Sequence, residues 1–220
     1  MSNGFPLIDI IFFAAVALFI AVRLRNVLGR RTGHERRPEP PLSPTSPDNV
    51  VKLPGRDEAQ DGPFGHVADP ELRDGLNAVR RHDPDFELEH FLGGARGAFE
   101  MIVLAFARGD AEMLRPLLAD EVYAGFAEAI EQREAAGETL ETEIVGIRTV
   151  EVVDARMEGS RAVVSVRFVS QQVNVTRGAD GSVLDGDPQH LAEVVDVWSF
   201  ARDTASRDPN WLLVATSAES

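Results

Sequence analysis

The stretch FELEHFLGGARGAFEMIVLAFAR, from Phe86 to Arg108, decides the fold. Its apolar residues recur every three or four positions, which is the period of one face of an α-helix. Gly109 follows as a helix stop. The pattern predicts one long helix that forms the hydrophobic spine of a domain. The apolar stripe contains Leu88, Phe91, Leu92, Ala95, Ala98, Phe99, Ile102, Val103 and Phe106.

Shorter helices are predicted on both sides of this spine. Asp69 and Pro70 supply an N-cap and a first-turn proline for the preceding helix. We interpret Gly93, Gly94 and Gly97, inside the spine, as positions where a neighbouring element approaches closely. The additional helices are expected over residues 70–81, 111–118 and 121–136.

Beyond Gly137 the apolar period changes from helix to strand. Val164, Val166 and Phe168 alternate with polar residues, and a bulge is expected near Gly146. Helices followed by strands indicate an α+β domain with its helices packed on one face of a four-stranded antiparallel sheet. The expected strands cover residues 139–156, 162–175, 191–202 and 211–216.

The N-terminal run Phe5 to Val22 is apolar except for Pro6 and Asp9. As a helix it would measure about 27 Å, close to the roughly 30 Å of a bilayer core. No Lys or Arg precedes it, which favours an uncleaved anchor over a cleaved signal peptide. We therefore predict a transmembrane anchor within residues 1–25.

Orientation follows from the arginines, which all come after the apolar run. Positively charged flanks stay on the cytoplasmic side, so the C-terminal domain is expected in the cytoplasm, held by a single pass in the inner (cytoplasmic) membrane.

Residues 26–69 are rich in Arg and Pro and poor in large apolar residues, and we expect a disordered tether there. The folded domain is expected over residues 70–220.

Composition excludes several classes of function. From Ala68 onward there are 29 acidic residues against 14 arginines, so the domain would repel a phosphate backbone and DNA is not an expected partner. The chain has no cysteine, and its five histidines show no metal-ligand spacing. No nucleophile elbow or phosphate-binding glycine loop is present, so no cofactor, metal or catalytic residue is predicted.

Asp196 is a polar residue in an otherwise apolar predicted strand, beside Trp198. One interpretation is a structural ion pair with an arginine such as Arg202. The alternative is a general base in a cavity that binds a small hydrophobic molecule.

Several fragments at both ends of the predicted domain form a recognisable set. The helical fragments are FLGGA at 91–95, AFEMIV at 98–103, AFARGD at 105–110 and LRPLL at 114–118. The closing fragments are DVWSFAR at 196–202 and SRDPNWLL at 206–213. Together they resemble the Tim44-like domain family, and the resemblance covers residues 84–216. With its N-terminal anchor, the chain is similar to the bacterial TimA branch.

The resemblance implies an NTF2-like or cystatin-like cone of helices and sheet around a large apolar pocket. Mitochondrial relatives are inner-membrane scaffolds that tether a chaperone motor to the import channel, and a ribosomal relative helps attach the large subunit to the membrane. In place of their long chaperone-binding region, this sequence has the anchor and the linker. Fold, membrane association and pocket are therefore the properties that the resemblance carries over.

The leading hypothesis is a membrane-anchored adaptor without enzymatic activity, whose pocket grips membrane lipid or a protein segment. Its expected partners are a translocon, chaperone or ribosome component. The runner-up is an enzyme or carrier for a small hydrophobic molecule, with Asp196 as the base. Predicted pocket-lining residues, which the alternative interpretation assigns simply to the core, are Phe91, Phe99, Val103, Phe126, Ile130, Trp198 and Trp211.

Overall fold

The computed structural model describes residues 62–218. The predicted anchor at 1–25 and nearly all of the predicted linker lie outside these residues. Within the described range, no helix combines the length and apolarity needed to cross a bilayer. The anchor thus stays a prediction from sequence.

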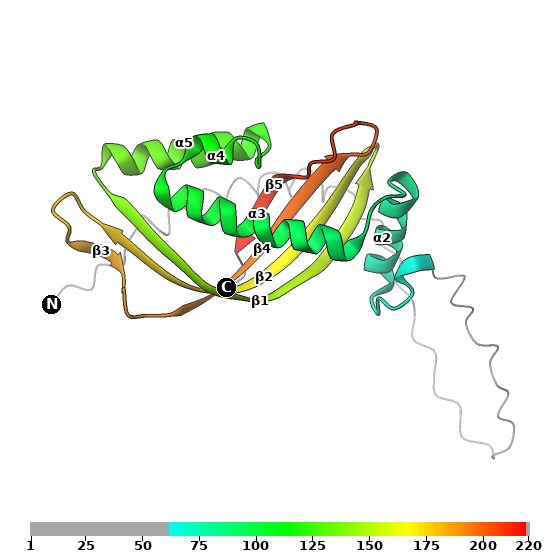
Figure 1. Cartoon of the computed structure of the whole chain (residues 1–220), viewed down its shortest axis with the longest axis horizontal. Helices are drawn as coiled ribbons and strands as arrows, with labels where there is room; N and C mark the ends of the chain where they lie inside the picture. Colours follow the sequence, from blue (N-terminus) through cyan, green and yellow to red (C-terminus); the bar gives the residue numbers. More distant parts are fainter. Residues whose placement is uncertain (1–61, 219–220) are drawn as a thin grey trace, which may run out of the picture.

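The described chain is an α+β domain in which helices pack on one antiparallel sheet (Figure 1). A short 3-10 helix, η1, opens it, and four α-helices precede all strands. The helices are η1 (Gly62–Phe64), α2 (Pro70–His82), α3 (Leu88–Arg108), α4 (Ala111–Leu114) and α5 (Asp120–Ala135). The strands are β1 (Thr139–Glu158), β2 (Arg161–Arg177), β3 (Val183–Gly186), β4 (Ala192–Asp203) and β5 (Leu212–Ala218).

Helix α3 is the predicted spine, and its ends follow from local chemistry. Gly109 adopts a left-handed conformation with φ 72°, and its N–H donates to the carbonyls of Ala105 and Phe106. A residue with a Cβ is disfavoured in that conformation, so the glycine ends the helix there. Asp69 caps α2 by accepting from the N–H of Glu71 at 2.9 Å.

The helix predicted over residues 111–118 is shorter in the structure and ends at Leu114. Pro116 explains the difference, because its ring and missing N–H interrupt an α-helix. The residues that follow bond to the sheet instead. Leu213 N–H donates to Leu117 O, and Ala119 N–H donates to Leu213 O, both at 2.9 Å.

The four long strands are antiparallel, as predicted, and they lie in the order β1-β2-β4-β5. Gly159, at φ 65°, turns β1 into β2, and a register shift between Ile144 and Gly146 confirms the predicted bulge. The sheet also contains a fifth strand that the sequence did not reveal: β3 pairs with the end of β2. It is only four residues long, and its one glycine, Gly186, resembles a loop residue.

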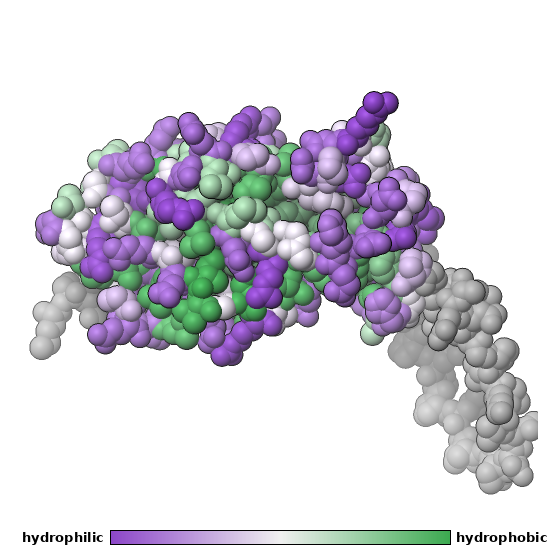
Figure 2. All heavy atoms as spheres, viewed as in Figure 1, coloured by the Kyte–Doolittle hydropathy of each residue, from purple (hydrophilic) through white to green (hydrophobic). Residues whose placement is uncertain are grey.

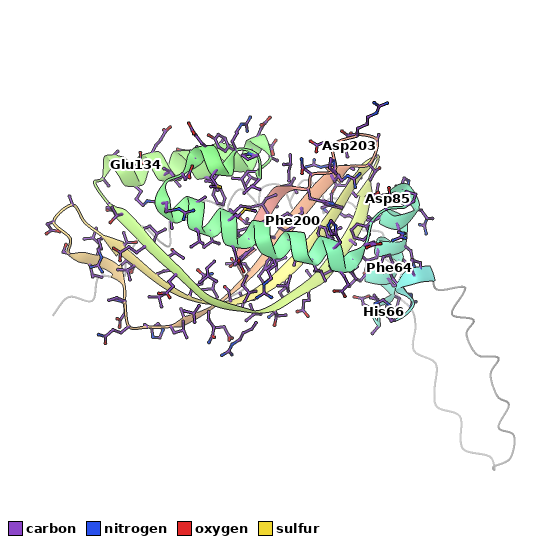
Figure 3. All side chains as sticks on the ribbon, in the orientation of Figure 1. Phe64, His66, Asp85, Glu134, Phe200 and Asp203 are labelled. Atoms are coloured by element: carbon purple, nitrogen blue, oxygen red, sulfur yellow. The ribbon has the colours of Figure 1, made fainter. Side chains whose placement is uncertain are left out.

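One half of the β1–β2 hairpin carries the core. We call it the closed half: residues 150–158 of β1, which pair with residues 161–168 of β2. Phe99 of α3 stacks on Phe168 with ring centroids 4.5 Å apart and contacts Trp198 at 4.7 Å. Phe200 lies beneath α3 in Figure 3 and meets Phe91 edge to face at 6.2 Å. Burial of these aromatic rings holds the helix to the sheet.

The other half, residues 139–149 of β1 paired with residues 169–177 of β2, is the open half. Here β4 pairs with β2 only as far as Gln172, and β5 ends at Ala218 opposite Asp196. The face that is apolar in the closed half becomes a polar ladder. Asn174 Nδ2 donates to Gln172 Oε1 at 3.3 Å, and Gln172 Nε2 donates to Ser170 Oγ at 2.8 Å.

The folded domain begins before residue 70. Phe64 in η1 is buried in the core and packs edge to face on Phe86, with centroids 6.3 Å apart. A single aromatic side chain between prolines and glycines gives no periodic signal, so Phe64 was predicted to belong to the linker. Close packing also fixes α2 against β1: a Cβ built on Gly75 would lie 1.9 Å from Ala155 O.

Candidate binding groove

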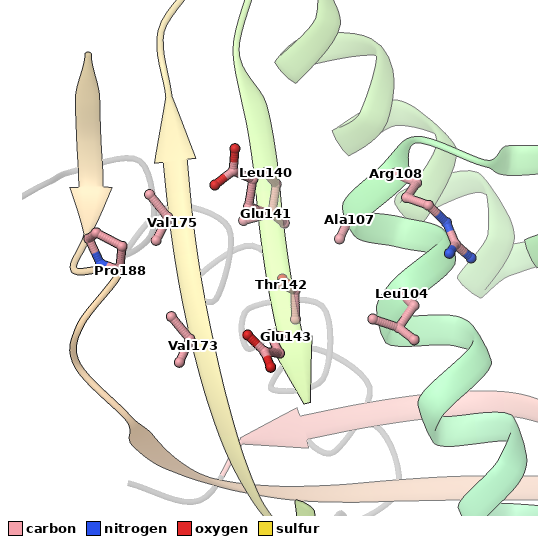
Figure 4. A pocket seen from close by; sticks show the side chains of 10 residues that line it. All are labelled: Leu104, Ala107, Arg108, Leu140, Glu141, Thr142, Glu143, Val173, Val175 and Pro188. Carbon is pink, nitrogen blue, oxygen red and sulfur yellow. The ribbon is translucent and has the colours of Figure 1, made fainter. Parts of the chain in front are cut away.

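A groove of about 450 Å³ lies between the end of α3 and the open half of the hairpin (Figure 4). This volume falls within the range of small-ligand and peptide-side-chain pockets. Figure 2 shows apolar side chains gathered on this face of the molecule, below the C-terminal part of α3. The lining residues are Leu104, Ala107 and Arg108 of α3, Leu140, Glu141, Thr142 and Glu143 of β1, Val173 and Val175 of β2, and Pro188.

Helix and strand are held side by side at the inner end of this groove. Arg96 Nη2 donates to Ile147 O at 3.3 Å, which ties α3 to the edge of β1. Leu104 and Ala107 follow Arg96 on α3 by two and three turns, so they face the earlier residues of β1. The helix thereby supplies one wall and the edge of β1 supplies the other.

Charged groups border the apolar walls. Glu141 and Glu143 are exposed on β1, and Glu141 forms an ion pair with Arg177 of β2 at 3.1 Å. Arg108 lies at the opposite wall, at the end of α3. Solvent screening makes such exposed pairs weak. They therefore contribute little to the stability of the fold.

Helix α5 lies over the C-terminal half of α3, and one arginine joins them. Arg133 Nη2 donates to Phe106 O at 2.7 Å and to Ala107 O at 3.2 Å, and its guanidinium lies over the Phe106 ring. Burial lowers the pKa of Arg133 below its usual range. The charge complements the carbonyl end of α3 and fixes the helix terminus that borders the groove.

The seven residues predicted to line a pocket lie elsewhere. Four are buried in the core between helices and sheet, and three are partly buried and packed against it, so none lines the groove. Their role in binding stays a prediction. The buried residues are Phe91, Phe99, Ile130 and Trp198, and the partly buried residues are Val103, Phe126 and Trp211.

Asp196 lies at the boundary between the two halves of the hairpin, opposite Phe168. Burial raises the pKa of its carboxyl to about 6, while a hydrogen bond with the Trp198 side chain opposes the shift. The predicted pairing with Arg202 is wrong. Arg202 Nη1 instead donates to Asp83 Oδ2 at 2.5 Å, linking β4 to the end of α2.

The interpretation of the α3 glycines is also wrong. A Cβ built on Gly93, Gly94 or Gly97 would meet no atom within 4 Å among the described residues. The position that does need a glycine for close approach is Gly75 in α2. Its place in an ordinary helical pattern gave no sign of the strand beside it, because sequence does not reveal which elements touch.

Sequence reasoning also missed the groove residues of α3. Leu104 and Ala107 fall outside the apolar stripe that marks the core, yet they are three positions apart and lie on one side of the helix. A second apolar stripe beside the core stripe was the available signal. Such a stripe marks a helix that is apolar on more than one side, as expected where it borders a binding groove.

Comparisons with known proteins agree on the domain. The family model for the Tim44-like domain matches residues 72–218. The mitochondrial import inner membrane translocase subunit TIM44 of Mus musculus is 29% identical over 179 residues, which is 79% of this chain and 40% of the mouse protein. The human subunit is 28% identical over 159 residues, covering 71% of this chain and 35% of the human protein. The chain therefore spans less than half the length of these relatives.

Solved structures with related shapes are more distant. The intermembrane space region of chloroplast protein ARC6 matches with a TM-score of 0.42 and 12% identity, covering 62% of this chain and 99% of that chain. An NTF2-like protein from Cytophaga hutchinsonii matches with a TM-score of 0.31 and 15% identity, covering 61% and 99%. The family match spans nearly all of the described domain, from α2 to β5, and this chain belongs to the Tim44-like domain family.

Proposed function

We propose that this protein is a membrane-anchored adaptor of the bacterial TimA branch, acting in protein translocation or membrane-protein biogenesis. The groove between α3 and β1 is the observation that carries the proposal, because it offers apolar walls on a domain whose relatives are import translocase subunits. A protein segment or a lipid acyl chain is the occupant that such walls accept.

The anchor and its orientation belong to this proposal. Residues 5–22 would cross the inner membrane once, with the domain in the cytoplasm. Because the chain has no cysteine, single cysteines introduced at Ser2 and at exposed Glu128 report topology without background. We expect an impermeant maleimide to label Ser2→Cys in intact spheroplasts and Glu128→Cys only after permeabilisation. Labelling of Glu128→Cys in intact spheroplasts would overturn the orientation.

Photocrosslinking in native membranes tests the adaptor role. A benzophenone amino acid at Leu104 samples the groove, and the same group at Met101 samples the same helix outside the groove lining. A third placement at Phe126 tests the predicted pocket. Mass spectrometry should identify a translocon, chaperone or ribosomal component captured from Leu104 and not from Met101.

Two other outcomes would change the proposal. Capture of lipid alone from Leu104 would make the domain a lipid-binding module. Equal capture of the same proteins from Leu104 and Met101 would show that the groove is not the contact site.

A second candidate function is an enzyme or carrier for a small hydrophobic molecule. The buried carboxyl of Asp196, with its pKa raised to about 6, is the observation that favours it, since a general base works best when its pKa is near the working pH. Asp196→Asn should then abolish the protein's role in cells while the domain stays folded. A variant that complements a deletion strain fully would exclude this candidate.

A further inference from the structure

We propose that the groove binds an extended segment of a partner polypeptide, which adds as a strand to the free edge of β1. This inference rests on the proposed adaptor role and names the occupant of its groove. Strand addition uses backbone hydrogen bonds for affinity and alternate side chains for specificity. The open half of β1 offers unpaired backbone groups and two faces of different side-chain chemistry.

The edge of β1 is unpaired over the open half. Among residues 62–218, β1 ends the strand order, with β2 as its neighbour on one side. Helix α2 covers the far end near Ala155, and Arg96 satisfies Ile147 O. Residues 139–146 are left with a row of outward backbone groups, which is the usual template for an added strand.

The two faces of this edge differ in chemistry. Thr142 and Ile144 pair with Asn174 and Gln172, so they lie on the same face as Phe168 and the core. Leu140 shares that face, and all three β1 residues are partly buried. Glu141 and Glu143 lie on the other face and are exposed.

These faces define the partner's sequence. Residues of an added strand that lie beside Leu140, Thr142 and Ile144 would point toward Leu104 and Ala107, and apolar side chains would pack there. Alternate residues would lie beside Glu141 and Glu143, where Lys or Arg is favoured. The partner segment is therefore about five residues long and alternates between apolar and basic side chains.

Charge favours a polypeptide over a lipid at this edge. The chain carries a formal net charge of −14. The charged side chains that line the groove are Glu141, which pairs with Arg177, Glu143 and Arg108, so the lining itself has a net charge of −1, which disfavours an anionic headgroup. A lipid acyl chain also cannot bond the outward N–H and C=O groups of β1. A basic, β-forming segment satisfies both requirements.

The test uses the full-length chain in neutral-lipid nanodiscs and a fluorescent probe peptide, acetyl-Lys-Val-Lys-Val-Lys-amide. Two analogues carry N-methyl groups, one on the valine amides and one on the lysine amides. In an added strand only alternate N–H groups face the neighbouring strand. We expect one analogue to bind at least tenfold more weakly and the other to bind like the parent peptide. Equal affinity of all three peptides would overturn the proposal.

Matched protein variants locate the site. Leu104→Arg should weaken peptide binding at least tenfold, whereas Met101→Arg, on the same helix but outside the groove lining, should leave it unchanged. Glu143→Lys should weaken binding, whereas Glu131→Lys on exposed α5 should not. Circular dichroism and tryptophan fluorescence check that each variant is folded. If a groove variant and its control lost equal affinity for the peptide, the interaction would be general charge attraction. That result would overturn strand addition.

The outcomes separate this inference from the adaptor role. If the peptide fails to bind while the Leu104 photocrosslinker still captures a translocon or ribosomal component, strand addition is wrong and the adaptor role stands. Displacement of the bound peptide by oleate, with N-methylation having no effect, would assign the groove to an acyl chain instead.

Discussion

The closed and open halves of the β1–β2 hairpin belong to the same antiparallel strand pair, interrupted by register shifts, but one half is covered by the core and the other borders a groove. In the closed half, Val164, Val166 and Phe168 are buried under α3. In the open half, the same face carries Ser170 and Gln172 in a hydrogen-bonded ladder beside a groove. Backbone pairing therefore does not distinguish core from site. Side-chain chemistry and the reach of α3 do.

The largest expected effect tests whether the aromatic cluster belongs to the fold rather than to a pocket. Phe99→Ala should lower the free energy of unfolding by about 3–5 kcal/mol, because a fully buried stacked ring is removed. Leu104→Ala should cost roughly 1 kcal/mol, because that side chain is partly exposed at the groove. Urea unfolding followed by the fluorescence of Trp198 and Trp211 measures both. Similar costs for the two variants would remove the distinction between the halves.

A buried ion pair should give the next largest effect, at the closed half. Arg202→Met leaves the carboxylate of Asp83 buried without its cation, and we expect a loss of about 3 kcal/mol. The double variant Asp83→Leu with Arg202→Met should recover much of that loss, because no unpaired charge remains. Equal stability of the single and double variants would contradict this account.

Asp196 marks the boundary between the halves and predicts a pH dependence. Its folded-state pKa of about 6 lies above the unfolded value of 3.8, so the protonated form is favoured by folding and stability falls as pH rises through this range. Asp196→Asn removes the buried charge and should gain up to about 3 kcal/mol at pH 8, with little gain at pH 3.5. Chemical denaturation at both pH values measures the difference. A gain of equal size at both would show that the charge is not responsible.

The smallest expected effects come from two helical glycines in contrasting surroundings. Gly75→Ala places a methyl group against Ala155 O and should cost about 1–3 kcal/mol. Gly97→Ala meets no described atom within 4 Å and should stabilise α3 by about 0.5–1 kcal/mol. Thermal unfolding of both variants shows whether each substitution raises or lowers the stability of the domain. A destabilising Gly97→Ala would point to a neighbour packed against that face.

Elements with a strong period were predictable from the sequence. Local rules predicted the apolar stripe of α3, the cap at Asp69 and the alternation around Phe168. The four long strands also follow one another along the chain as predicted. Short elements without a period were not. Both η1 and β3 depend on tertiary contacts, namely Phe64 against Phe86 and Val175 opposite Gly186.

The site was harder to predict than the fold. Large aromatic residues suggested a pocket, but size and facing describe a core equally well, and Phe99 and Trp198 are buried there. The groove depends instead on where α3 ends relative to β1, which is a distance that no sequence period encodes. The arginine partner of a buried acid was missed for the same reason: Asp83 and Arg202 lie 119 positions apart.

The backbone bridge between Leu118 and Leu213 sets an order for folding. The β1–β2 hairpin closes over a turn at Gly159 and needs little loop entropy, so we expect it to form early. The Leu118 bridge joins segments separated by most of the domain, so we expect it to form later. Until that step, α5 lacks the attachment to β5 that this bridge provides.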